Sequence, residues 1–132
     1  MKSRYIFAMI AVTMSLAGTA TAEIRYTQNG THQTTSLGGL SDDPSCTMIN
    51  IGGKVVQRNF AKDGVTMSGF AVEMPDGTRQ HVNVWISDDL NMAEKSIVYD
   101  GLQRLLREGR EMKGQATACG AAGRILMLDS VR

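Results

Sequence analysis

Apolar and polar residues alternate along two runs in the middle of the chain, from Val65 to Met74 and from Arg79 to Ile86. An alternation with a period of two indicates a strand that buries one face. The segment Pro75-Asp76-Gly77-Thr78 separates the two runs, and its proline and glycine supply the backbone angles that a tight reversal needs. The pattern therefore predicts a β-hairpin.

The alternation also predicts which side chains of this hairpin share a face. On the first strand, the residues expected on one side are Thr66, Ser68, Phe70, Val72 and Met74. On the return strand, Val82, Val84 and Ile86 point towards the core. The residues of the return strand that are expected to point outward are Arg79, His81, Asn83 and Trp85.

Three more strands are expected around this hairpin. Two apolar runs, Thr47 to Ile51 and Val55 to Arg58, flank Gly52-Gly53 and predict a strand that bends or bulges at its glycines. Near the end of the chain, short strands are predicted from Lys113 to Cys119 and from Arg124 to Val131. A glycine-rich connection between them favours a turn.

One helix is expected between the hairpin and the last two strands. Asn91 can cap it, with Glu94 three residues later in the position of a capping box. Gly109 is a natural stop. The apolar stripe of this helix consists of Ile97, Val98, Leu102, Leu105 and Leu106.

Three strands, a helix and two strands follow one another in the order of an OB-fold. We therefore expect a mainly β fold with one helix, built as a small five-stranded Greek-key barrel in the order β-β-β-α-β-β. A rolled α+β sheet with the helix on one face is the alternative architecture.

The first 22 residues resemble a secretory signal peptide. Lys2 and Arg4 precede an apolar run from Tyr5 to Leu16, and Ala20-Thr21-Ala22 suits cleavage after Ala22. The run is too short to span a bilayer as a stable helix, so no membrane anchor is expected after cleavage. We expect export to the periplasm or to the outside of a bacterial cell. Polar residues 23–45 are expected to form a flexible arm or an edge strand, and residues 46–132 the OB-like domain.

The two cysteines, Cys46 and Cys119, are expected to form one disulfide, because thiols usually pair in an oxidising compartment. In the expected barrel the first strand lies beside the fourth, so the start of one and the end of the other can reach bonding distance. A redox-active or metal-binding pair would need a C-x-x-C spacing or nearby histidines. His32 and His81 are isolated in the sequence.

Charge gives no global reason for binding nucleic acid or an anionic membrane. The whole chain has a formal net charge of +1, with 14 basic and 13 acidic residues. Lys2 and Arg4 are lost with the signal peptide, which leaves a chain close to neutral. Any such binding would need a local patch.

The outward row of the return strand is the first candidate for ligand binding, namely Arg79, His81, Asn83 and Trp85. OB-folds bind oligonucleotides or oligosaccharides on their second and third strands, and an aromatic face can stack on a base or a sugar. The alternative is structural: Trp85, the sole tryptophan, packs beneath the helix or the arm, and the other three side chains are solvated.

A weaker candidate is a basic patch for phosphate or acidic glycans, made of Arg104, Arg107, Arg110 and Arg124. The first three of these arginines also complement the carboxyl end of the expected helix, and acidic residues are interleaved with them.

No motif for catalysis is present in the sequence, which has neither a nucleophile elbow nor a phosphate-binding loop. The acidic pairs Asp42-Asp43 and Asp88-Asp89 are expected to serve in turns rather than to bind calcium. We expect no cofactor and no metal ion, and we favour a protein that is not an enzyme.

Residues 61–131 resemble the OB core of staphylococcal-nuclease-like proteins. Asp63-Gly64-Val65-Thr66 stands where that family has Asp-Gly-Asp-Thr, and residues 105–110 and Gly123-Arg124 are similar to the end of its helix and its late Gly-Arg. Val65 replaces a metal-binding carboxylate of that family. The resemblance therefore implies a non-catalytic relative.

From Cys46 to its end, the chain also resembles the exported B subunits of the cholera and heat-labile enterotoxin class. Those subunits are signal-bearing OB-folds of similar length, and their two cysteines bracket the same elements. The resemblance implies a pentamer that binds host glycans. After Cys119 this chain has Gly-Ala-Ala-Gly, where those subunits carry a sugar-stacking tryptophan.

These observations favour an exported, non-catalytic binding or interaction module whose partner is a glycan or an envelope protein. Two alternatives stay open. One is a nuclease-like or envelope-polymer hydrolase with a degenerate site, and the other is a structural component of the envelope whose N-terminal arm orders on a partner.

Overall fold

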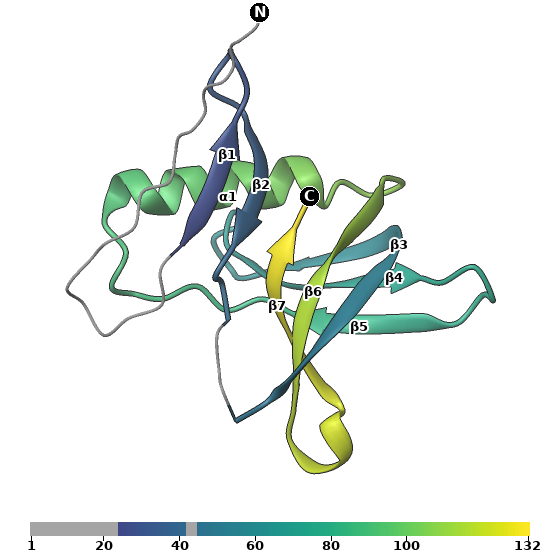
Figure 1. Cartoon of the computed structure of the whole chain (residues 1–132). Coiled ribbons are helices and arrows are strands. Elements are labelled where there is room, and N and C mark those ends of the chain that lie inside the picture. The colour runs from purple at the N-terminus through teal and green to yellow at the C-terminus, as the bar shows by residue number, and fades with distance from the viewer. Residues whose placement is uncertain (1–23, 42–44) are drawn as a thin grey trace, which may run out of the picture.

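Five strands close into a barrel in a computed structural model that describes residues 24–41 and 45–132 (Figure 1). The strands are β3 (Thr47–Phe60), β4 (Met67–Glu73), β5 (Arg79–Asn83), β6 (Glu111–Cys119) and β7 (Ile125–Val131). Their order around the barrel is β3-β4-β5-β7-β6, and β6 pairs with β3 again. The β5–β7 pair is parallel and the other four pairs are antiparallel. The expected β-rich fold with a five-stranded barrel and one helix is confirmed.

Helix α1 (Met92–Leu105) lies between β5 and β6 in the sequence, as expected, and crosses one end of the barrel (Figure 1). Its capping box is present: the backbone N–H of Glu94 donates to Asn91 Oδ1 at 2.8 Å, and that of Asn91 donates to Glu94 Oε1 at 2.9 Å. The helix ends before Gly109, which has a φ of 89° in the following turn. This helix is not long and apolar enough to cross a membrane, and neither is any other helix of the described residues.

The disulfide between Cys46 and Cys119 is confirmed, with 4.9 Å between the two Cα atoms. It joins the start of β3 to the end of β6, where Thr47 pairs with Ala118 in an antiparallel ladder. The bridge therefore secures the seam at which the first and fourth barrel strands meet. In the chain-entropy model, closing a loop of this length removes roughly 4 kcal/mol of unfolded-state entropy.

The segment expected to be a flexible arm or an edge strand contains two strands, β1 (Arg25–Gln28) and β2 (Thr34–Gly38). They form a hairpin that extends the sheet, because β2 also pairs with β7. Thr34 is fully buried against α1, and its hydroxyl donates to the carbonyl of Ile97 at 3.2 Å. The signal-peptide prediction, residues 1–22, lies outside the described residues.

The core lies inside the barrel and beneath α1. Its largest fully buried side chains include Phe70, Met67, Leu102, Leu106, Met112 and Leu128. The expected face of β4 is correct at Phe70 but wrong at Ser68, which is exposed while Met67 is buried. A register shift opposite Asn59 and Phe60 inserts one extra residue in β4, and this reverses the alternation at its start.

Candidate functional site

The outward row of β5 is exposed along most of its length. Arg79 and His81 are exposed and Asn83 is half-buried, while Val82 between them is fully buried. Trp85 follows two residues after the strand and is 58% exposed. The backbone N–H of Val84 still donates to the carbonyl of Ser68, so the chain stays paired with β4 up to this tryptophan.

Two neighbouring strands complete this surface, which we call the strand face. In the register of the sheet, Gln57 of β3 lies opposite Ala71 of β4, and Ala71 lies opposite His81 of β5. Two residues further along, Asn59, Gly69 and Asn83 lie opposite one another in the same way. Residues directly opposite each other on adjacent strands share a face. The strand face is therefore Gln57, Asn59, Gly69, Ala71, Arg79, His81, Asn83 and Trp85. The sequence did not single out the residues of β3, because their alignment with β5 depends on the bulges between the strands.

Small residues at the centre of the strand face bring its polar side chains together. A Cβ added at Gly69 would lie 3.1 Å from His81 Nε2, so the imidazole rests over this glycine. Gln57 Nε2 donates to Asn59 Oδ1 at 3.0 Å on the same face. Asn83 Nδ2 donates to the carbonyl of Leu126 at 3.2 Å and ties the face to β7 at the parallel pairing. Asn83 thus has a structural role in joining β5 to β7, in addition to any contact with a ligand.

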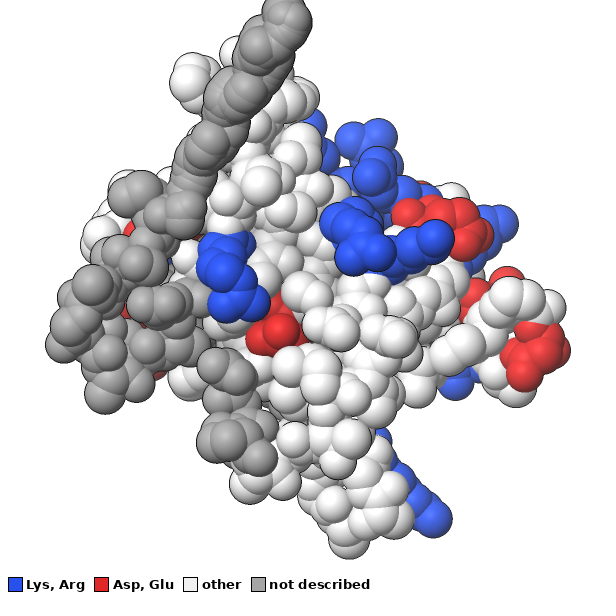
Figure 2. Space-filling view, viewed as in Figure 1, with Lys and Arg blue, Asp and Glu red and all other residues white. Residues whose placement is uncertain are grey.

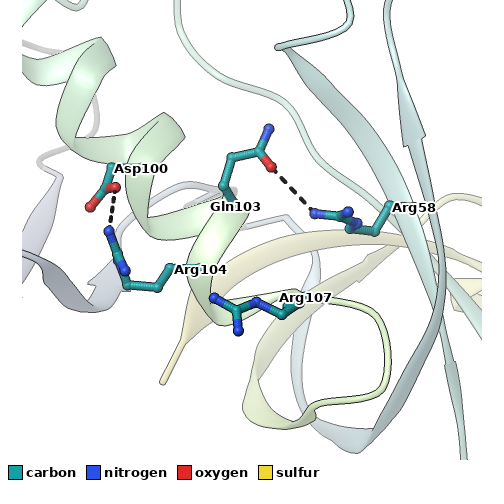
Figure 3. Close-up of a pocket in the computed structure, with 5 residues that line it drawn as sticks. All are labelled: Arg58, Asp100, Gln103, Arg104 and Arg107. Atoms are coloured by element: carbon teal, nitrogen blue, oxygen red, sulfur yellow. Dashed lines mark hydrogen bonds and ion pairs between the residues drawn. The ribbon is translucent and has the colours of Figure 1, made fainter.

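A second candidate is a hollow between α1 and β3, with a volume of about 470 Å³, which we call the arginine groove (Figure 3). It is lined by Arg58, Asp100, Gln103, Arg104 and Arg107. Figure 2 shows lysine and arginine side chains gathered over the region where α1 ends. The sequence missed Arg58, because nothing local indicates that β3 passes beside this helix.

Arg58 and Arg104 are both held by neighbouring groups. Arg58 Nη1 donates to Gln103 Oε1 at 3.3 Å, and its guanidinium carbon lies 5.3 Å from the centre of the Phe60 ring. Arg104 Nη2 donates to Asp100 Oδ1 at 3.0 Å. That hydrogen bond is the main reason why the pKa of Asp100 lies below its ordinary value of 3.8, and the backbone N–H of Thr34 adds to the effect.

The structure divides the four arginines of the predicted basic patch. Arg104 and Arg107 line the groove, whereas Arg110 and Arg124 do not. Arg124 follows the short helix η2 (Ala121–Gly123), in the connection between β6 and β7. That connection lies at the opposite end of the barrel from α1 (Figure 1).

A further hollow, of about 410 Å³, lies on the other side of the Arg104–Asp100 pair. Its lining comes from the β1–β2 hairpin and from α1: Gln28, Thr31, His32, Gln33, Thr34, Ser96, Ile97, Asp100 and Arg104. The ion pair therefore separates two concave regions along one side of the helix.

The motif that resembles the nuclease family forms the turn between β3 and β4. Asp63 Oδ1 accepts from the backbone N–H groups of Val65 and Thr66, each at 2.8 Å, and Asp63 Oδ2 accepts from the Thr66 hydroxyl at 2.6 Å. The carboxylate is thus occupied by its own turn. No group of three or more histidine, cysteine, aspartate or glutamate side chains in residues 24–41 and 45–132 is placed to hold a metal ion.

Of the other two acidic pairs, only Asp88-Asp89 lies in the described part of the chain, and it contributes to no such cluster there. In the pair Asp88-Asp89, the backbone N–H of Asp89 donates to Ser87 Oγ in the connection before α1. Asp42-Asp43 lies outside the described residues. The chain matches no protein-family model, no curated protein and no solved structure.

Proposed function

We propose that the chain is an exported, non-catalytic binding module that contacts its ligand through the strand face. The exposure of Trp85 is the observation that carries this proposal, since 58% of the residue is accessible beside a row of polar side chains. Tryptophan is highly buried on average, and an exposed indole supplies a large apolar surface for stacking. Aromatic residues of this kind contribute strongly to binding energy when a ligand covers them.

The chemistry of the strand face favours a glycan as the ligand. Gln57, Asn59 and Asn83 carry amides, which both donate and accept hydrogen bonds and so suit the hydroxyl groups of a sugar. Glu73 lies opposite Arg79 in the β4–β5 ladder and opposite Lys54 in the β3–β4 ladder, so this end of the face carries one acidic and two basic residues. A face with little net charge is poorly suited to a nucleic-acid backbone.

Export and assembly belong to the same proposal. The signal-like N-terminus and the Cys46–Cys119 disulfide support an oxidising compartment, the periplasm or the exterior. The similarity to enterotoxin B subunits supports a ring of about five copies, in which weak glycan contacts would add up.

Trp85 is the only tryptophan, so its fluorescence tests the proposal directly. We expect the emission to change when the oxidised protein is titrated with members of a panel of muropeptides, neutral oligosaccharides and sialylated oligosaccharides. By calorimetry, Trp85→Ala should weaken binding of the responding ligand by at least about tenfold.

Met92→Ala is the matched control, because Met92 is an apolar residue that is 80% exposed at the start of α1. It should bind as the unmodified protein does. If Trp85→Ala and Arg79→Ala both stay folded and bind every identified ligand with unchanged affinity, the proposal is wrong.

A further inference from the structure

The arginine groove gathers three guanidinium groups around one hollow. Arg58 reaches it from β3, Arg104 from the last turn of α1, and Arg107 from the residues that follow the helix (Figure 3). Among the described residues, the lining contains a single carboxylate, that of Asp100. Glu108 stands close by, with its Oε2 4.0 Å from Arg58 Nε. The groove therefore holds an excess of positive charge.

Two of the guanidinium groups are fixed in position and yet have hydrogen-bonding capacity left. The Nε atoms of Arg58 and Arg104 are buried and have no hydrogen-bond partner among the described residues. Buried donors of this kind nearly always have a partner, which can be a water molecule or a ligand; the Glu108 Oε2 atom lies 4.0 Å from Arg58 Nε, beyond hydrogen-bond distance. A guanidinium presents five N–H donors, and the contacts already described use few of them.

Arg107 carries the guanidinium group of the groove that is not engaged by a neighbouring side chain. Its side chain makes no hydrogen bond or ion pair with any other described residue, and it is exposed. In Figure 3 no dashed line reaches it, although Arg58 and Arg104 beside it are both engaged. An unengaged arginine next to two fixed ones can close on a ligand without breaking an existing contact.

We infer that the arginine groove binds a tetrahedral dianion, the phosphate monoester group of a small ligand or free phosphate. Arginine forks match such groups with two parallel hydrogen bonds each. Three guanidinium groups against the carboxylates of Asp100 and Glu108 leave an excess of positive charge, and a doubly charged ligand gains more from this excess than a singly charged carboxylate does. The site is independent of the strand face, because Arg58 lies between Gln57 and Asn59 on β3 and points from the opposite side of that strand towards Gln103 of α1 (Figure 3).

The test uses the full oxidised protein and NMR signals of the arginine Nε–H groups. Titration with inorganic phosphate at constant ionic strength should shift the Nε–H signals of Arg58 and Arg104 with one common, saturable affinity. Acetate at the same ionic strength should not saturate them. The variant Arg107→Gln should weaken phosphate binding by roughly tenfold, because it removes charge-assisted hydrogen bonds.

Arg124→Gln is the matched control, since it removes the same charge at the opposite end of the barrel and should leave the affinity unchanged. Repeating the titration with glucose 6-phosphate distinguishes a phosphate monoester from free phosphate as the source of the dianion. Glucose 6-sulfate carries a tetrahedral group with a single charge and should bind more weakly than glucose 6-phosphate. The inference is overturned if the Nε–H signals do not saturate, or if Arg107→Gln and Arg124→Gln weaken binding equally. Failure of glycan binding at Trp85 would leave this result unaffected.

Discussion

At the scale of single residues, the motif at the β3–β4 turn shows how a carboxylate can be engaged by the backbone of its own turn. Asp63 accepts three hydrogen bonds from Val65 and Thr66 within that turn. These bonds favour the ionised carboxylate, and the largest contribution comes from the Thr66 hydroxyl. The sequence singled out this motif through its resemblance to the nuclease family and did not predict its role in the turn, which depends on hydrogen bonds within residues 63–66.

The pKa of Asp63 should lie below its ordinary value of 3.8 in the folded protein. A group whose pKa is lowered on folding stabilises the folded state above its unfolded-state pKa, and this stabilisation is lost as the pH falls through the folded-state value. The contribution of Asp63 should therefore disappear on acidification below about pH 3.8. Thr66→Val should raise the pKa towards 3.8, as measured by an NMR titration of the carboxyl carbon.

A matched control comes from the β4–β5 turn. There the Thr78 hydroxyl donates to Asp76 at 2.6 Å and lowers the pKa of that carboxyl in the same way. Thr78→Val should raise the pKa of Asp76 and leave that of Asp63 unchanged. A pKa of Asp63 at or above 3.8 in the unmodified protein would contradict this description of the turn.

At the scale of elements, the structure agrees with the sequence wherever the signal is local. The β4–β5 hairpin and α1 are set by a turn tetrapeptide and a capping box, which lie within a few residues of the backbone they direct. The turn of the β1–β2 hairpin also carries a local signal, Asn29-Gly30, in which Asn29 Oδ1 accepts from the backbone N–H groups of Thr31 and Gln33. The position of this hairpin against the barrel has no such signal. Its partners are β7 and α1, and Thr34 contacts a helix residue 63 positions later in the chain. Contacts over such distances depend on the whole fold.

Gly101 allows this hairpin to pack on α1. A Cβ at this position would lie 2.7 Å from Leu37 Cδ1 and 2.8 Å from Thr34 Cγ2, closer than real side-chain contacts allow. Replacing glycine by alanine inside a helix normally stabilises it by about 1 kcal/mol. We nevertheless expect Gly101→Ala to raise the hydrogen-exchange rates of β2 amides, because the hairpin must move away from the helix.

Ser96→Ala is a control within the same helix, because Ser96 is exposed and makes no hydrogen bond from its side chain to any described residue. It should leave the exchange of β2 amides unchanged, and the barrel amides should stay protected in both variants. Equal protection of β2 in Gly101→Ala and in the unmodified protein would show that the hairpin does not depend on this close approach.

At the scale of the whole molecule, barrel closure separates two chemically different surfaces. The strand face lies outside the sheet of β3, β4 and β5, and the arginine groove lies where α1 crosses the barrel end (Figures 1 and 3). Half of the strand face followed from alternation along β5. The place of Gln57 and Asn59 on this face could not be predicted, since a sequence pattern along one strand does not specify which residues of a neighbouring strand lie opposite. The place of Arg58 in the arginine groove could not be predicted for the same reason.

The measurement that tests the central claim most directly is a map of backbone amide shifts on the oxidised protein, titrated with an oligosaccharide that changes Trp85 fluorescence. The account predicts that saturable shifts fall on the outer residues of β3, β4 and β5, around Gln57, His81 and Trp85, and leave the arginine groove unchanged. Shifts centred on the β1–β2 hairpin or the β6–β7 connection, with none on this face, would contradict it.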